Sequence, residues 1–438
     1  MLTAALLTKL TPFLLGGWLW IWQQSKKKIT PALLYLLALA LLLRLVLLFQ
    51  TPLFYAPDEE AHFNYIRYLA LKKKLPTELH RTNSRSKDWE YYQPPLYYLL
   101  LAPLYKVVHH WQPRNLSLQV YSLRLVSLFF ALATAYFSSR LLWSQRNPFP
   151  ALAVLLFFLF LPSYLFLSVM INNDNLLFLL TALALYLLAE DNWGRQRSLL
   201  LGLVLGLSFL TKLSAIVPVA VVFFYWGLKF ISSPAQRREL LQSFIFLFLL
   251  AGTGLALVFW RNYYSFKLWN PEAVVNVPVY WASYQEAWQR TLPYLRQTFW
   301  AAAGIYNNLR FWPHLNSFLL SIAAGGWLIL FFLRWKKENL NVFPLGLGKN
   351  KFFLALSAGL ILNLLLLARF AWLYRQGQGR FLYPSLLISA WFLLRGWTAG
   401  FYFLRWRSRW GWWGALGLFF LYYALHFVTF NLVKFSQL

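Results

Sequence analysis

The feature that most constrains this chain is its succession of long apolar runs. A run of about 18 or more apolar residues with few charges predicts a membrane-spanning helix, because helical hydrogen bonding satisfies the backbone inside lipid. We therefore predict an all-α polytopic membrane protein of about 11 or 12 transmembrane helices, which form one transmembrane domain over residues 1–438. The runs lie at about 3–22, 30–50, 118–142, 149–169, 175–189, 199–211, 214–231, 240–260, 314–333, 352–373, 382–400 and 411–430.

The composition excludes most alternatives. Hydrophobic residues make up 60% of the 438 residues and charged residues only 12%, whereas soluble domains carry about 25% charged residues. Too few charges remain to cover a water-facing surface, and the high hydrophobicity excludes intrinsic disorder. The chain has no cysteine, which excludes disulfides, thiolate zinc sites and a cysteine nucleophile.

The formal net charge of +28 indicates orientation in a membrane, and we expect no nucleic-acid partner. Basic residues in short loops mark the cytoplasmic side of a membrane protein. This rule leaves two long polar and aromatic stretches, about 51–117 and about 261–313, as outer loops on the opposite face, where we expect interfacial helices. The basic residues of the cytoplasmic loops are Lys26, Lys27, Lys28, Arg140, Arg146, Arg195, Arg197, Arg237, Arg238, Arg334, Lys336, Lys337, Arg405, Arg407 and Arg409.

The scarce acidic residues gather on the non-cytoplasmic face, and three of them are consecutive. Asp58, Glu59 and Glu60 follow the second span directly. Adjacent carboxylates at a membrane surface repel one another and are costly to desolvate, so they suit a general base, a metal ligand or both. Helical spacing would place His62 on the same face as Asp58. The alternative is a solvated helix start, with His62 as a structural histidine.

Two further motifs on this face are less specific. The segment Tyr91 to Tyr98 includes Tyr92 and Gln93 followed by two prolines, and it predicts a helix that begins at the membrane interface. A polar turn that includes Asn173 and Asp174 separates two spans. An interfacial anchor and a plain turn are the respective alternatives.

Several cations share this face and predict a site for an anionic ligand. They are Lys212, Arg261, Arg310, Arg375 and Arg380. Arginine binds a phosphate through its planar fork, and lysine binds it as a point charge. The alternative is that each side chain extends to the lipid headgroups. No dinucleotide fingerprint or Walker motif accompanies these cations, so the sequence predicts no nucleotide site.

The order of these motifs resembles the GT-C class of integral-membrane glycosyltransferases, in particular its protein O-mannosyltransferase and aminoarabinose-transferase branch. The resemblance covers most of the chain, and its motifs lie in one order on one side of the membrane. They are Pro57-Asp58-Glu59, the segment Tyr92 to Tyr97, the turn Asn172 to Asp174, Thr211-Lys212, Arg261-Asn262 and the turn Gln378 to Arg380.

The resemblance implies roles for these residues. Asp58 resembles the catalytic acidic residue of the first outer loop, and Glu59 resembles its partner, which orients the acceptor or a divalent ion. If a metal ion takes part, Asp58 and Glu59 are its expected ligands. The donor phosphate is expected at Lys212, Arg261, Arg375 and Arg380, and the pocket at His62, Tyr92, Gln93, Asn173, Asp174 and Arg310.

The implied reaction transfers a sugar from a polyprenyl-phosphate donor to an acceptor on the non-cytoplasmic face, with inversion and with an aspartate as base. A lipid, a glycan and a protein all remain acceptors, and the sugar is open. The expected location is a bacterial inner membrane, with the active site facing the periplasm. Two other hypotheses are a lipid-phosphate or sugar transporter (a flippase) and a non-enzymatic scaffold. A transporter should carry ionisable residues near the middle of the membrane, whereas here they crowd one face.

Overall fold

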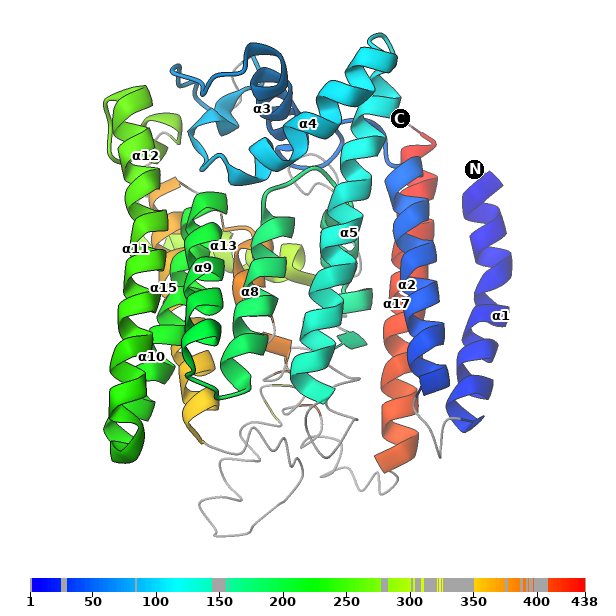
Figure 1. Ribbon diagram of the computed structural model, residues 1–438. Coiled ribbons are helices and arrows are strands. Elements are labelled where there is room, and N and C mark those ends of the chain that lie inside the picture. The colour runs from blue at the N-terminus through cyan, green and yellow to red at the C-terminus, as the bar shows by residue number, and fades with distance from the viewer. Residues whose placement is uncertain are drawn as a thin grey trace.

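A bundle of long helices, capped at one end by shorter ones, makes up most of the structure (Figure 1). The computed structural model describes residues 2–24, 30–82, 85–143, 155, 156, 158–276, 283–300, 302, 303, 309, 310, 321, 323, 325, 350–374, 377–386, 389, 390, 393, 397 and 409–437. The expected span at about 314–333 lies almost entirely outside these residues, as does most of the one at about 382–400.

The long helices run along the axis of the bundle. Apolar side chains on the outside of α11, such as Phe248 and Leu249, are exposed, as expected for a surface that faces lipid. Among the described residues, five helices are long and apolar enough to cross a membrane. This confirms a polytopic all-α membrane protein, while the total of about 11 or 12 spans stays a prediction. The long helices are α1 (Leu2–Gln24), α2 (Thr30–Gln50), α5 (Leu116–Trp143), α8 (Asp174–Ala189), α9 (Arg195–Thr211), α10 (Ile216–Ser232), α11 (Arg237–Phe266), α15 (Asn350–Tyr374) and α17 (Arg409–Phe435).

Segments of both long polar stretches of the sequence meet at one end of the bundle. The first forms α3 (Glu59–Lys72), the 3-10 helix η1 (Trp89–Tyr92) and α4 (Leu96–Trp111), and the second contributes α12 (Glu272–Val275) (Figure 1). The two stretches touch, because the amide of Thr82 donates to the carbonyl of Val275 at 3.1 Å. The two outer loops therefore build one cap.

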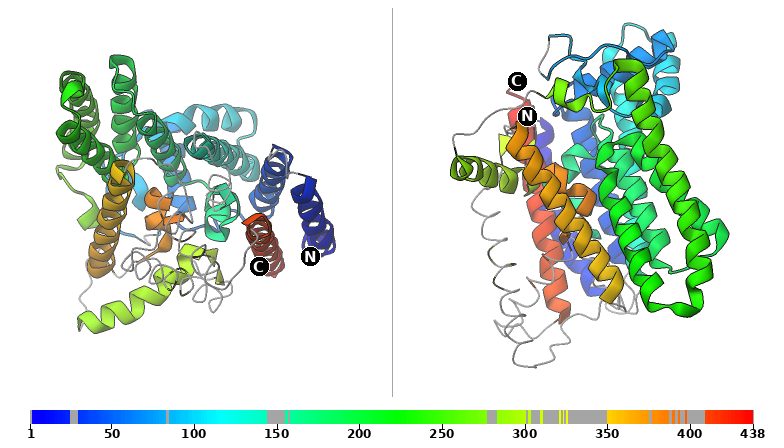
Figure 2. Two further views of the ribbon diagram at one scale, coloured as in Figure 1. Left: turned by 90° about the horizontal axis from the view of Figure 1, so that it is seen from below. Right: turned by 90° about the vertical axis from the view of Figure 1, so that its left-hand side faces the viewer.

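Helix α13 (Tyr284–Trp300) lies across the bundle rather than along it (Figure 2). Its exposed Trp288 and Leu292, together with charged residues such as Arg290, give it the amphipathic character of a helix that rests in the membrane interface. Its other face packs against the 3-10 helix η5 (Gly379–Ser385). The expected interfacial helix of the second outer loop is thus joined to a late segment of the chain.

Glycines bring α9 and α11 into backbone contact. A Cβ atom on Gly254 would lie 2.4 Å from the carbonyl oxygen of Gly206, so neither helix could approach as closely with a larger residue. Small residues at such crossings allow close packing of helices in lipid. This packing fixes the end of α9, which delivers Lys212 to the capped end of the bundle.

Short elements complete the described chain. Two strands of two residues each form an antiparallel pair, which the sequence does not predict. The division into one domain over residues 1–438 stays a prediction. The short elements are α7 (Pro162–Leu167), η2 (Leu213–Ala215), η3 (Pro234–Gln236), β1 (Ala302–Ala303) and β2 (Leu309–Arg310).

Candidate active site

Asp58 lies in the turn between α2 and α3 with a left-handed backbone, φ 62° and ψ 1°. This conformation is uncommon outside glycine, although aspartate tolerates it better than most residues. It turns the chain sharply before α3 begins at Glu59. The Asp58 carboxylate accepts hydrogen bonds from Trp89 Nε1 at 3.3 Å and from Arg380 NH2 at 2.5 Å. Strained backbone of this kind often occurs at functional sites.

The surroundings of Asp58 favour its charged form. Burial acts to raise the pKa of this carboxyl group, but attraction to Arg380 and the hydrogen bonds from Arg380 and Trp89 outweigh burial. The net effect lowers the pKa of Asp58 below its ordinary value. At neutral pH Asp58 is therefore a carboxylate held in an ion pair.

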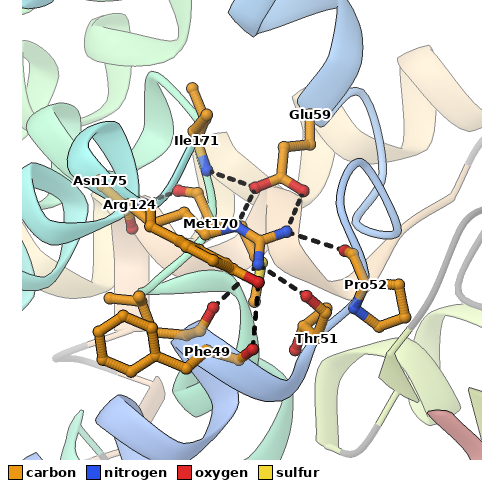
Figure 3. A network of polar contacts seen from close by, with 10 residues as sticks. Phe49, Thr51, Pro52, Glu59, Arg124, Met170, Ile171 and Asn175 are labelled. Carbon is orange, nitrogen blue, oxygen red and sulfur yellow. Dashed lines mark hydrogen bonds and ion pairs between the residues drawn. The ribbon is translucent and has the colours of Figure 1, made fainter. Parts of the chain in front are cut away.

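Glu59 differs from the expectation, because its carboxylate turns away from Asp58 into a fully buried ion pair with Arg124 of α5 (Figure 3). Arg124 Nε and NH2 donate to the two Glu59 oxygens at 2.8 and 2.7 Å. The amide of Ile171 donates to one of these oxygens at 3.2 Å, and the guanidinium also donates to the carbonyls of Thr51 and Pro52. Glu59 thus ties the start of α3 to α5 and to the segment at Ile171, and its side chain does not line the cavity beside Asp58.

That cavity, of about 310 Å³, is lined by residues of η1 and α12, which belong to the capped end of the bundle. It is a mixed surface of aromatic, amide and charged side chains. Trp89, Asn262 and Phe370 are examples of its wall. The site residues expected from the sequence that line this cavity are Asp58, His62, Tyr92, Gln93, Asp174, Lys212 and Arg380.

Lys212 enters the cavity from the end of α9, and Asp174 enters from the start of α8. The Lys212 Nζ atom lies 2.7 Å from Asp174 Oδ1. The backbone of Lys212 is extended, which ends α9 and begins η2. Two short turns on one side of the membrane therefore supply a second acid–cation pair beside that of Asp58 and Arg380.

Arg380 keeps buried donors that hold no partner among the described residues. Its NH2 group holds Asp58, whereas its Nε and NH1 groups are buried and have no hydrogen-bond partner among the described residues. The amide of the neighbouring Gly379 donates to Thr298 of α13 at 2.6 Å. A Cβ atom on Gly379 would lie 2.1 Å from the backbone nitrogen of Phe299, so only glycine fits here. Helix α13 thereby holds the turn that presents Arg380.

His62 lies one turn into α3, as the spacing from Asp58 predicts. Burial lowers the pKa of His62 to about 3, even though Asp58 opposes this effect. Its Nδ1 atom lies 2.9 Å from the Tyr98 hydroxyl. His62 is therefore a neutral histidine in the wall of the cavity.

Other expected residues lie elsewhere. Arg261 does not line the cavity, because its guanidinium donates to the carbonyls of Tyr91 and Tyr92 and to the Tyr65 hydroxyl. Asn173 is buried behind the wall, where its amide donates to the carbonyl of Thr211. Arg375 lies outside the described residues, and so does the side chain of Arg310.

Three charged residues of the cavity were not expected from the sequence. Glu90, Glu272 and Arg369 all line it. Glu90 lies between the aromatic residues that lead into the two prolines, and this proximity to a motif was its only signal. Arg369 lies inside an apolar run and is naturally interpreted as a cation that extends to the headgroups.

The expected metal ligands do not form a shared site. Asp58 accepts from Arg380 and Trp89, while both oxygens of Glu59 accept from Arg124. The two carboxylates thus point into different surroundings, although divalent ions need convergent oxygen ligands. A divalent ion held by Asp58 and Glu59 does not fit this geometry, and we derive no step from one.

Comparison with known proteins identifies the family. The family model for glycosyltransferase family 87 matches residues 91–357, which lie between Asp58 and Arg380 in sequence. A search of curated proteins finds no match. Among solved structures, the chain is similar to ArnT from Cupriavidus metallidurans in the apo state, with 15% identity and a TM-score of 0.40 over 85% of this chain and 76% of that one. The same protein bound to undecaprenyl phosphate gives 15% identity and a TM-score of 0.41 over the same shares. The family match covers more than half of the chain, which therefore belongs to glycosyltransferase family 87 and is an integral-membrane glycosyltransferase.

Proposed function

We propose that this glycosyltransferase takes its sugar from a polyprenyl-phosphate donor and transfers it to an acceptor in the cavity beside Asp58. The observation that carries the proposal is Arg380. One nitrogen of its guanidinium holds the Asp58 carboxylate, and the other two nitrogens, Nε and NH1, are buried without a partner among the described residues; Arg380 itself lines the cavity. Unpartnered buried donors are costly, so such an arrangement favours an anionic ligand. A phosphate fits this fork, and Lys212 adds a second positive charge nearby.

The chemistry is a direct displacement. The acceptor oxygen or nitrogen attacks the anomeric carbon, the bond from that carbon to the phosphate oxygen breaks, and its electron pair stays with the polyprenyl phosphate. Asp58 accepts the proton of the acceptor, while Arg380 and Lys212 stabilise the charge that develops on the phosphate. One displacement inverts the configuration at the anomeric carbon.

The ion pair explains how a carboxylate of low pKa can act as a base. In the free cavity Arg380 lowers the pKa of Asp58. A bound phosphate would share the positive charge of Arg380, which weakens its hold on Asp58 and raises the basicity of that carboxylate. The donor would then switch on the base, which limits transfer to complexes that contain donor.

The orientation supports a non-cytoplasmic site. The cavity is lined by residues of both long stretches at the capped end of the bundle, whereas α9 and α11 begin at the opposite end with the basic residues Arg195 and Arg237. In a bacterium the capped end would face the periplasm, where a polyprenyl-phosphate donor is presented to acceptors of the cell envelope.

The test uses purified protein in lipid nanodiscs with a panel of polyprenyl-phosphate sugars. We expect transfer or slow hydrolysis that releases polyprenyl phosphate, detected by thin-layer chromatography. Asp58→Asn should abolish this release, whereas Asp88→Asn, a change in the same loop outside the cavity, should leave it intact. Full activity in Asp58→Asn contradicts the role of the base. Movement of the intact donor across a liposome membrane without release would instead favour a flippase.

A further inference from the structure

Glu90 is a buried carboxyl group of the cavity that the displacement above does not use. It lies in η1, next to the Trp89 that donates to Asp58, and its side chain lines the cavity. Only 7% of the residue is exposed, and its Oε2 atom is buried without a hydrogen-bond partner among the described residues. An acceptor atom in this state is either protonated or reserved for a ligand.

Three other acids at or near the cavity are neutralised by ion pairs. Asp58 pairs with Arg380, Asp174 pairs with Lys212, and Glu59 behind the wall pairs with Arg124. Within the described part of the chain, no cation forms an ion pair with Glu90. Burying a carboxylate without a counter-ion is unfavourable in free energy, so the neutral acid is the more stable form of Glu90.

The charges that face Glu90 are mixed. Asp58 repels the ionised form of Glu90, while Lys212 and Arg380 attract it, and the hydroxyl groups of Tyr92 and Tyr98 lie close by. Burial has the largest effect, and together with Asp58 it raises the pKa of Glu90 to about 8. At neutral pH Glu90 therefore carries a proton, and its carboxylic acid is a hydrogen-bond donor.

We propose that Glu90 binds the donor phosphate as a neutral carboxylic acid, donating its proton in a hydrogen bond to a phosphate oxygen. This rests on the proposed function. The cavity would then hold a phosphodiester between cations on one side and a protonated acid on the other. An ionised Glu90 would repel the same phosphate, so the donor and the Glu90 proton bind together. The structure thus couples donor binding to pH through a residue that takes no part in breaking bonds.

A phosphodiester without a sugar tests this coupling directly. Farnesyl methyl phosphate carries one negative charge that does not titrate near neutral pH, so any proton taken up on binding comes to the protein. Calorimetry at about pH 9 in two buffers of different ionisation enthalpy measures that uptake. We expect wild-type protein to take up close to one proton for each phosphodiester bound. Its affinity should fall about tenfold for each pH unit above about 8.

Two variants make the result specific. Glu90→Gln keeps a hydrogen-bond donor but cannot titrate, so it should bind the phosphodiester without proton uptake and with an affinity that no longer changes across this range. Glu78→Gln, an exposed glutamate of the same outer loop, should behave as wild type.

The outcomes separate the two proposals. Binding to wild-type protein without proton uptake, or unchanged uptake in Glu90→Gln, overturns the role of Glu90 and leaves the proposed function standing. No binding of the phosphodiester at any pH overturns the proposed function itself. The wild-type measurement needs no variant, so it decides the question even if Glu90→Gln does not fold.

Discussion

Arg380 NH2 lies 2.5 Å from Asp58 Oδ2, although the two residues are 322 positions apart in the chain. This contact joins the first outer loop to the turn that follows α15. It also couples the candidate base to the candidate phosphate ligand, since a substitution at either residue removes the ion-pair partner of the other.

Replacing Arg380 with lysine should cost about 100-fold in kcat/KM. Lysine keeps the charge but lacks the planar fork, so it cannot hold Asp58 and a phosphate at the same time. Steady-state kinetics with a polyprenyl-phosphate sugar measure the loss. Arg290→Lys, at an exposed arginine of α13, is the matched control and should stay within twofold or so of wild type. Wild-type kinetics in Arg380→Lys would show that the fork is not used.

Replacing Glu59 with glutamine should lower the stability of the protein and leave its chemistry intact. The change leaves Arg124 buried without its counter-ion, which costs about 3–5 kcal/mol. Thermal denaturation in detergent should show a lower melting temperature, while the protein that remains folded keeps its kcat. Glu60→Gln, at the neighbouring acid, should change neither quantity. A Glu59→Gln protein with wild-type stability and lost turnover would instead restore the catalytic role that the sequence suggests for Glu59.

Gly379→Ala should impair the enzyme through α13. The added Cβ would lie 2.1 Å from the backbone nitrogen of Phe299, so the turn must move and carry Arg380 with it. We expect a fall of about 10- to 100-fold in turnover, because small displacements of positioning groups are costly. Gly252→Ala, where a Cβ has nothing within 4 Å, is the control. Equal activity in the two variants would argue against this support of Arg380.

The stability of the protein should depend on pH through Glu90. Its pKa rises from an ordinary 4.5 to about 8 on folding, mainly because it is buried. Between these values the folded state holds a proton that the unfolded state has released, so stability falls as the pH rises, by up to about 1.4 kcal/mol per unit. Glu90→Gln should remove this part of the slope when melting is followed at several pH values. An unchanged slope would mean that Glu90 is already ionised in the folded protein.

Much of the fold follows from the sequence because lipid imposes few solutions. The apolar runs predict the helices, and the basic loops predict which long stretches share a face. Four charged residues from the sequence motifs line one cavity. They are Asp58, Asp174, Lys212 and Arg380. Their convergence is favoured by the alternation of the spans, which returns every second loop to the same end.

The rest depends on tertiary packing that no local pattern encodes. Asp58 and Glu59 are neighbours in sequence, yet the left-handed turn at Asp58 sends their carboxylates to different partners. Arg124 lies within an apolar run and gives no sign of the partner it will meet. Glu90 becomes a cavity residue only because η1 packs beside Asp58. Tertiary packing decides which distant residues form ion pairs. The sequence could therefore identify the acidic residues but could not assign a separate role to each.

The contact between Gly379 and Phe299 also determines how deep Arg380 lies relative to the membrane surface. Helix α13 has the amphipathic surface of a helix embedded in the headgroup layer, and it holds the residue next to Arg380 by backbone contact. The guanidinium is thereby anchored at one depth relative to the bilayer surface. A lipid donor would be held by its phosphate at this depth, so its binding would depend little on the length of its polyprenyl tail. On the proposed mechanism an acceptor would have to bring its nucleophile to that depth, so reach would be the property by which acceptors are selected.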